Sequence, residues 1–184
     1  MATDIELATG ATVWLTGLPS AGKTTLATAL AERLHAEGRP VEVLDGDAIR
    51  SVLSPELGYS RADRDTNVAR IGWVAQRLAK HGVLAIAAVV SPFAAAREAV
   101  RAEHESRDLP FFEVHVATPV QVCAARDVKG LYARQRKGAL AGLTGIDSEY
   151  EPPSTPELRL DTGGRSVDDI VEELIAVLRK ENLA

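Results

Sequence analysis

The chain has little cysteine and no excess of basic residues. Cys123 is its only cysteine, which excludes an intrachain disulfide and a thiol-rich metal site. Its 26 Asp and Glu outnumber its 21 Lys and Arg, giving a formal net charge of −5. Proteins that bind nucleic acid or anionic membranes need the opposite balance, so we expect neither partner. Binding of a small anion is compatible with this charge, because it requires only a local basic cluster.

Long apolar runs are also missing. No run approaches the ~18 residues that a membrane-spanning helix needs. The stretch Met1 to Thr9 contains Asp4 and Glu6 and lacks the basic start of a signal peptide, so we expect a cytoplasmic protein. The four histidines show no ligand pairing such as His-x-x-x-His, and we expect them at the surface or at helix ends.

Short apolar runs alternate with helical periodicities along the chain, which is typical of a parallel α/β sheet. Leu26, Leu30 and Leu34, for example, recur every four residues after a first apolar run. The uninterrupted apolar run 83–90 predicts a central strand covered on both sides. We expect strands at 11–16, 41–44, 83–90, 111–117 and 158–160, and helices at about 23–37, 60–82, 94–107 and 167–180.

The segment 127–156 is rich in Gly, Pro, Lys and Arg and has no sustained period. A segment of this length without regular structure inside a compact domain is usually functional, so we expect a lid. Residues 1–184 are expected to form one domain of three layers, with helices on both faces of a mostly parallel sheet of about five strands. Trp14, Trp73 and Cys123 are interpreted as packing residues.

The segment Gly17-Leu-Pro-Ser-Ala-Gly22-Lys23-Thr24 matches the phosphate-binding loop G-x-x-x-x-G-K-[ST]. Its glycines let several backbone N–H groups point at one anion, and the dipole of the following helix adds to the attraction. Lys23 is expected to reach the β and γ phosphates of a nucleotide, and the Thr24 hydroxyl to bind Mg²⁺. An apolar strand before the loop and a periodic helix after it support a fold of the P-loop NTPase type.

The acidic turn Asp45-Gly46-Asp47 follows the second expected strand, at the sheet edge where open parallel sheets bind their ligands. Two carboxylates there could position an acceptor hydroxyl and hold water on Mg²⁺. A surface turn with a helix cap is the alternative, since Asp favours both. No other expected strand ends in an acidic residue, so this turn offers the best available partners for the metal.

Basic and polar residues come next along the chain. Arg64 and Asn67 are three residues apart and share a helix face, and Arg50 lies just after the acidic turn. Guanidinium groups suit sulfate and phosphate oxygens, although a solvated charged surface is the alternative. Ser91 follows the central strand, where it either faces a ligand or caps the next helix. Four basic residues of the expected lid could close over phosphates: Lys129, Arg134, Arg136 and Lys137.

These motifs, in this order, resemble the adenylylsulfate kinase family, which phosphorylates adenosine 5′-phosphosulfate (APS). The resemblance covers about residues 12–161. Beside the common phosphate loop it rests on five more specific elements: Leu44-Asp-Gly-Asp47 with Arg50, Gly58-Tyr-Ser-Arg-Ala-Asp-Arg64 with Asn67, Ser91-Pro-Phe93, Lys129-Gly-Leu-Tyr132, and Thr144-Gly-Ile-Asp147.

The resemblance implies a stand-alone, homodimeric enzyme that transfers the γ-phosphoryl group of ATP, with Mg²⁺, to the 3′-hydroxyl of APS. The product would be 3′-phosphoadenosine 5′-phosphosulfate (PAPS), made in sulfate assimilation. ATP would bind to Gly17, Leu18, Pro19, Ser20, Ala21, Gly22, Lys23, Thr24 and Thr25. APS would bind to Asp45, Asp47, Arg50, Tyr59, Arg64, Asn67, Ser91, Pro92, Phe93, Lys129 and Leu143. Lys23, Asp47 and Ser91 would be catalytic, and Thr24 and Asp47 would hold the metal.

By the family pattern, Asp47 would orient or deprotonate the acceptor hydroxyl, and Tyr59 would stack on the adenine of APS. The chain departs from the pattern at Leu143, where the family often has an aromatic residue, and at Ala94–Ala96, which lack the usual basic residue.

Two alternatives are a P-loop kinase for another small anionic or nucleoside-like acceptor, and a nucleotide-binding protein without turnover. A GTPase should carry Asn-Lys-x-Asp, which is absent, and a degenerate protein should have lost Lys23 or Asp47, which are present.

Overall fold

Five parallel strands form the centre of the protein, in the order β2-β3-β1-β4-β5. The computed structural model describes residues 10–184, so the expectation about a signal peptide concerns residues outside the described part. The strands are β1 (Ala11–Thr16), β2 (Val41–Asp45), β3 (Leu84–Ala88), β4 (Phe111–Val116) and β5 (Leu158–Leu160). The expected parallel sheet of five strands is confirmed.

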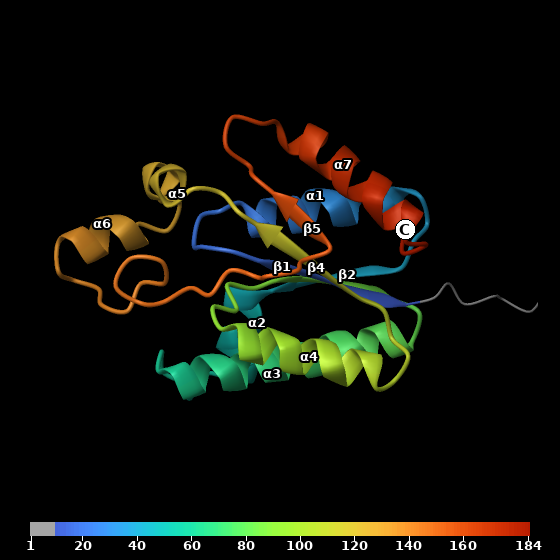
Figure 1. Ribbon diagram of the computed structural model, residues 1–184, viewed down its shortest axis with the longest axis horizontal. Coiled ribbons are helices and arrows are strands. Elements are labelled where there is room, and N and C mark those ends of the chain that lie inside the picture. Colours follow the sequence, from blue (N-terminus) through green and yellow to red (C-terminus); the bar gives the residue numbers. More distant parts are fainter. Residues whose placement is uncertain (1–9) are drawn as a thin grey trace, which may run out of the picture.

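Helices cover both faces of this sheet (Figure 1). The helices α1 (Lys23–Ala36) and α7 (Val167–Lys180) lie on one face. The opposite face carries α2 (Gly46–Leu53), α3 (Arg61–Lys80) and α4 (Ala94–Glu105). Two short helices, α5 (Val120–Arg126) and α6 (Leu131–Arg136), lie beyond the carboxyl ends of the strands. The three-layer arrangement is therefore as expected.

The alternation of side chains along β1 divides the core into two parts. Val13 and Leu15 pack with the leucine stripe of α1 and with α7, whereas Trp14 packs with α3 and α4. All three are fully buried. A fully buried side chain of this size contributes about 1.5–3 kcal/mol, so the two layers hold the sheet, and with it the carboxyl ends of its strands, in place.

The start of α3 shows how local sequence fixes an element that carries site residues. Ser60 accepts a hydrogen bond from the backbone N–H of Asp63, and the Asp63 carboxylate accepts one from the backbone N–H of Ser60. This is a reciprocal capping box, with Asp in the place of Glu or Gln. It fixes the first turn of the helix, on which Arg64 and Asn67 lie.

Several sequence-based interpretations were wrong or incomplete. The helices α2 and α6 were not expected, and α6 lies inside the segment expected to be irregular. Trp73 is 62% exposed, because the buried face of α3 runs through Val68, Ile71 and Ala75 and leaves Trp73 outside it. Its ring lies under the Arg77 guanidinium instead. His115 is buried in β4 rather than at the surface or a helix end.

Candidate functional site

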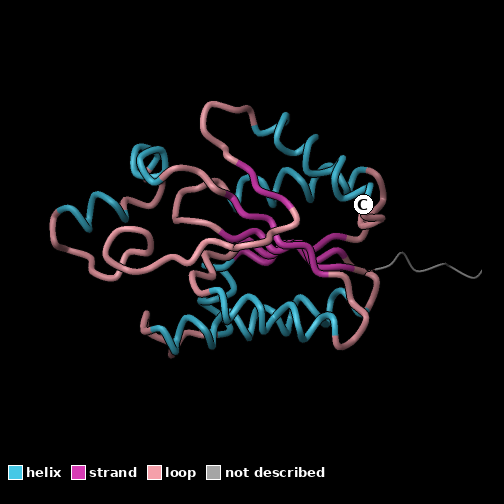
Figure 2. The backbone as a smooth tube through the Cα atoms, in the orientation of Figure 1, coloured by secondary structure: helices cyan, strands magenta, loops and turns pink. Residues whose placement is uncertain are grey.

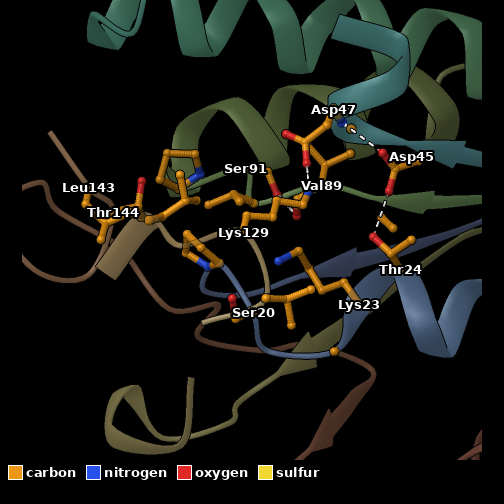
Figure 3. A pocket seen from close by; sticks show the side chains of 18 of the residues that line it. Ser20, Lys23, Thr24, Asp45, Asp47, Val89, Ser91, Lys129, Leu143 and Thr144 are labelled. Carbon is orange, nitrogen blue, oxygen red and sulfur yellow. Dashed lines mark hydrogen bonds and ion pairs between the residues drawn. The ribbon is translucent and has the colours of Figure 1, made fainter. Parts of the chain in front are cut away.

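The loops that follow the strands gather at the carboxyl edge of the sheet (Figure 2). They enclose an open cleft of about 1140 Å³, slightly above the roughly 300–1,000 Å³ of typical small-molecule sites. Figure 3 shows some of the side chains that line it. Most residues predicted from the sequence do so: Pro19, Ser20, Gly22, Lys23, Thr24, Thr25, Asp45, Asp47, Arg50, Tyr59, Arg64, Asn67, Ser91, Pro92, Lys129 and Leu143.

The phosphate loop joins β1 to α1 and leaves the first turn of the helix free. Gly22 stands at the N-cap with φ +105°, and no side chain caps the helix there. Gly17 has φ +153°, and a Cβ at this position would lie 2.4 Å from the carbonyl oxygen of Val116. Both positions require glycine. The backbone N–H groups at the start of α1 are therefore available to an anion.

Lys23 places its ammonium group inside the loop. Its Nζ donates to the carbonyl oxygens of Gly17 and Leu18 at 2.9 and 2.8 Å. Burial lowers the pKa of Lys23 to about 8. The amine is thus held next to the place where a phosphate would bind. The two carbonyl groups stabilise its positive charge only in part.

Thr24 and Asp45 are the residues of the cleft that could best hold a metal ion. The Thr24 hydroxyl donates to Asp45 Oδ2 at 2.7 Å, and Figure 3 shows the two side chains pointing toward each other. A hydroxyl, a carboxylate and phosphate oxygens are the ligands that Mg²⁺ prefers, so these residues fit the ion. Among residues 10–184 there is no group of three or more His, Cys, Asp or Glu that could hold a metal alone. The sequence analysis named the turn Asp45-Gly46-Asp47 for the metal and chose Asp47 beside Thr24, whereas the structure brings Asp45 to the Thr24 hydroxyl.

Asp47 lies at the start of α2 and forms an ion pair with Lys129. Figure 3 shows the lysine crossing the cleft to reach the carboxylate. Both side chains are largely exposed to solvent, at 72% for Asp47 and 55% for Lys129. Exposed pairs of this kind are weak, so a ligand with its own charges can displace the lysine at little cost.

A second basic group faces the phosphate loop from α2 and α3. Arg50 lies 4.6 Å from the ring centre of Tyr59 and donates to the carbonyl oxygen of Leu57 at 3.0 Å. Arg64 donates to the carbonyl oxygens of Tyr59 at 2.9 Å and Gly142 at 2.7 Å, and to the Thr144 hydroxyl. Burial lowers the pKa of Arg64. Arg64 thus connects the start of α3 to the segment that contains Leu143.

Asn67, one turn after Arg64, is the polar residue of this group without a complete set of partners. It is buried and lines the cleft, and its Oδ1 accepts no hydrogen bond from the described residues. Buried side-chain oxygens are normally satisfied, so this acceptor is available to a donor group of a ligand.

The Ser91 hydroxyl, expected to be catalytic, is instead used in hydrogen bonds within the protein. It accepts from Trp14 Nε1 at 3.0 Å and donates to Thr16 Oγ1 at 3.0 Å, and Ser91 is 1% exposed. Phe93 does not line the cleft; the Arg61 guanidinium covers its ring at 4.0 Å. In both cases the sequence named the right segment, but it could not show which atoms the fold uses for packing.

One polar cluster around the phosphate loop was missed. The carbonyl oxygen of Ala21 accepts from the hydroxyls of Thr118 and Thr162 at 3.0 and 2.9 Å. Arg126 donates to the hydroxyl and carbonyl oxygens of Thr162, both at 2.7 Å. Arg126 and Thr162 also line the cleft. Thr162 closely follows β5, so the rule that ligands bind at the carboxyl ends of strands could have indicated it.

Comparison with known proteins agrees with this geometry. The family model for adenylylsulphate kinase matches residues 9–161. The adenylyl-sulfate kinase of Synechococcus sp. (strain JA-3-3Ab) is 49% identical over 170 residues, covering 92% of this chain and 94% of the relative. The solved APS kinase of Mycobacterium tuberculosis in complex with AMPPNP and APS has a TM-score of 0.89 and 44% identity, covering 92% of this chain and 98% of that chain.

A more distant structure shares the fold alone. The gluconokinase of Sinorhizobium meliloti has a TM-score of 0.61 but 17% identity, over 95% of this chain and 94% of its own. The near-full-length match at 44–49% identity and the family match over the cleft residues lead to one conclusion. This chain belongs to the adenylylsulphate kinase family.

Proposed function

We infer that this protein is an adenylyl-sulfate kinase, which transfers the γ-phosphoryl group of ATP to the 3′-hydroxyl of APS and releases ADP and PAPS. One observation carries the inference. A phosphate loop and a facing set of Arg50, Arg64 and Asn67 line the same cleft, in a chain that matches this family over residues 9–161. The guanidinium groups suit an acceptor that carries a phosphosulfate.

The reaction forms a bond between the 3′-oxygen of APS and the γ-phosphorus, and breaks the bond from that phosphorus to the oxygen that leaves with ADP. Lys23 and the N–H groups of the phosphate loop hold the β and γ phosphates in line for this step. Thr24 and Asp45 would hold Mg²⁺, and the ion would supply neutralisation of phosphate charge. Positioning and charge neutralisation dominate the rate, because the transition state is loose.

Asp47 accepts a hydrogen bond from the acceptor hydroxyl and orients it. The hydroxyl proton passes to Asp47 or to solvent, and a loose transition state requires no strong base. Ligand binding first draws Lys129 away from Asp47 to phosphate oxygens, which frees the carboxylate for the acceptor hydroxyl. Tyr59 stacks on the adenine of APS and Leu143 lies in the same acceptor half of the cleft, which Ser91 and Pro92 also line.

The segment 127–156 is proposed to act as a lid that carries Lys129 and Leu143 over the ligands. We also propose one domain over residues 1–184, a homodimer, and a place in the cytoplasm. No helix among residues 10–184 has the length and apolar character needed to cross a membrane.

The test is ADP release from ATP and Mg²⁺ in the presence of APS, of nucleosides, of sugar acids, or of water alone. Turnover that requires APS, with a product that carries a new 3′-phosphate, is the expected result. Turnover with another acceptor would retain the kinase and exclude APS. Binding of ATP without turnover of any acceptor would leave a nucleotide-binding protein.

A further inference from the structure

Arg97 is a buried cation that lies outside the cleft and is bonded both to the turn after β3, which lines the cleft, and to the end of the segment 127–156. It is on α4, it is 3% exposed, and it is not among the residues that line the cleft. A buried guanidinium is unfavourable unless its charge is paired and its N–H groups have acceptors. The acceptors that satisfy it therefore indicate what this residue holds together.

Each nitrogen of the guanidinium has a different partner. Nε donates to Glu113 Oε1 at 2.8 Å, which pairs the charge with a buried carboxylate on β4. Nη1 donates to the carbonyl oxygen of Ser91 at 2.7 Å, and Nη2 to that of Glu151 at 2.7 Å. The last two acceptors belong to the turn after β3 and to the end of the lid segment, which are 60 residues apart in sequence.

The turn after β3 needs such support. Ser91 has φ +38°, a left-handed conformation that is unfavourable for a residue other than glycine. Ser91 and Pro92 both line the cleft. The hydrogen bond from Arg97 to the Ser91 carbonyl oxygen stabilises this conformation from the side of the turn that faces away from the cleft.

The end of the lid segment is fastened to the same place. The backbone N–H of Glu151 donates to the carbonyl oxygen of Pro92 at 2.8 Å, and the Glu151 carboxylate accepts from the backbone N–H of Ala94 at 2.7 Å. The hydroxyls of Tyr150 and Thr16 are 3.1 Å apart. The cleft-lining residues 142–144 therefore lie only a few residues before a point, at Tyr150 and Glu151, where the chain is fixed to the rest of the protein.

We propose that Arg97 is a positioning residue for the acceptor half of the site. It locks the Ser91-Pro92 turn to the end of the lid segment, so that Leu143 and Thr144 are held opposite Arg64. This inference rests on the proposed function, because it assigns that half of the cleft to APS. Arg97 itself does not touch the ligand.

Arg101, one turn later on α4, provides a matched control. It also faces Glu113, at 3.7 Å, and it forms a bidentate pair with Glu157 at 2.6 and 2.8 Å. Neither Ser91 nor Glu151 is bonded to it among the described contacts. Arg101→Lys perturbs the same ion network but leaves the hydrogen bonds from Arg97 to Ser91 and Glu151 in place.

The experiment compares Arg97→Lys, the double variant Arg97→Met with Glu113→Met, and Arg101→Lys. Lysine keeps the charge beside Glu113 but cannot donate in the three directions of a guanidinium. The double variant leaves no unpaired buried charge, so it should keep the fold. We expect both Arg97 variants to raise the KM for APS about tenfold with the KM for ATP within about twofold, and Arg101→Lys to change neither.

Two results would overturn the proposal. One is a wild-type KM for APS in either Arg97 variant, with only the thermal midpoint lowered, which would make the role structural. The other is an equal rise of both KM values. Hydrogen exchange of amides 142–151 in the ligand-free protein provides a readout that needs no turnover. We expect faster exchange in Arg97→Lys, and unchanged exchange would contradict the proposal even if APS proved not to be the acceptor.

Discussion

Thr24, in the first turn of α1, donates its hydroxyl hydrogen to Asp45 at the end of β2, with 2.7 Å between the two oxygens. The other oxygen of the same carboxylate accepts from the backbone N–H groups of Asp47 and Ala48, both at 3.1 Å. Asp45 therefore connects the Thr24 hydroxyl of the phosphate loop to the first turn of α2. The element that carries Asp47 is thus held by the residue that we propose as a metal ligand.

Asp45→Asn separates these two tasks. Asn caps a helix as well as Asp does, so α2 should persist, but the neutral amide is a poorer Mg²⁺ ligand. We expect the Mg²⁺ concentration for half-maximal turnover to rise about tenfold, with an unchanged far-UV circular dichroism spectrum. Glu32→Gln on the exposed side of α1 is the control. An unaltered Mg²⁺ dependence in Asp45→Asn would exclude Asp45 from the metal site.

Titration of Lys23 should make kcat/KM for ATP depend on pH. Because burial lowers its pKa to about 8, the free enzyme loses the ammonium charge as the pH rises through that value. Bound phosphates favour the charged form, so the loss affects the free enzyme first. We expect kcat/KM for ATP to fall about tenfold per pH unit above pH ~8, while kcat holds to higher pH.

The profile is measured between about pH 6.5 and 9.5, and Lys23→Ala should lower turnover at least a hundredfold. A flat kcat/KM through that range would show that the lysine keeps an ordinary pKa.

Asp47→Ala tests the residue proposed to orient the acceptor. The side chain is 72% exposed and is paired with Lys129 alone, so its removal should leave the unfolding midpoint nearly unchanged. We expect kcat to fall at least about a hundredfold, because the hydroxyl loses its orientation. Asp168→Ala, an exposed carboxylate on α7, is the control. Near-normal kcat in Asp47→Ala would remove this residue from the mechanism.

Arg64→Ala should affect the acceptor and spare the nucleotide. Arg64 is bonded to Gly142 and Thr144 and lines the cleft on the side opposite the phosphate loop. We expect the KM for APS to rise roughly 10- to 100-fold and the KM for ATP to stay within about twofold. Arg77→Ala, on the same helix but beside Trp73, should change neither. Equal changes in both KM values would show that Arg64 orders the whole cleft.

The parts of the fold and site that follow a local rule could be predicted from the sequence. The stripe of Leu26, Leu30 and Leu34 predicted α1, and the apolar run 83–90 predicted the buried strand β3. The spacing of the phosphate loop placed Lys23 and Thr24, since a strand, a glycine-rich turn and a helix leave one arrangement for the backbone.

The parts that depend on individual side-chain contacts could not be predicted. The helix α6 has six residues and depends on Asp127, whose carboxylate accepts from the N–H groups of Tyr132 and Ala133. The pairing of Thr24 with Asp45, rather than Asp47, is decided by the direction of the Asp45 side chain as it caps α2. Trp73 was misplaced because an aromatic residue on a helix resembles a core residue until the buried face is known.

The hydrogen bond from Trp14 to Ser91 gives the protein an internal optical reporter. Trp14 is fully buried, whereas Trp73 is 62% exposed, so acrylamide should quench the emission of Trp73 and largely spare that of Trp14. In a Trp73→Phe variant the remaining indole would sense the cleft wall through a single bond to Ser91. Its fluorescence could then follow the entry of each ligand in unlabelled protein, one ligand at a time.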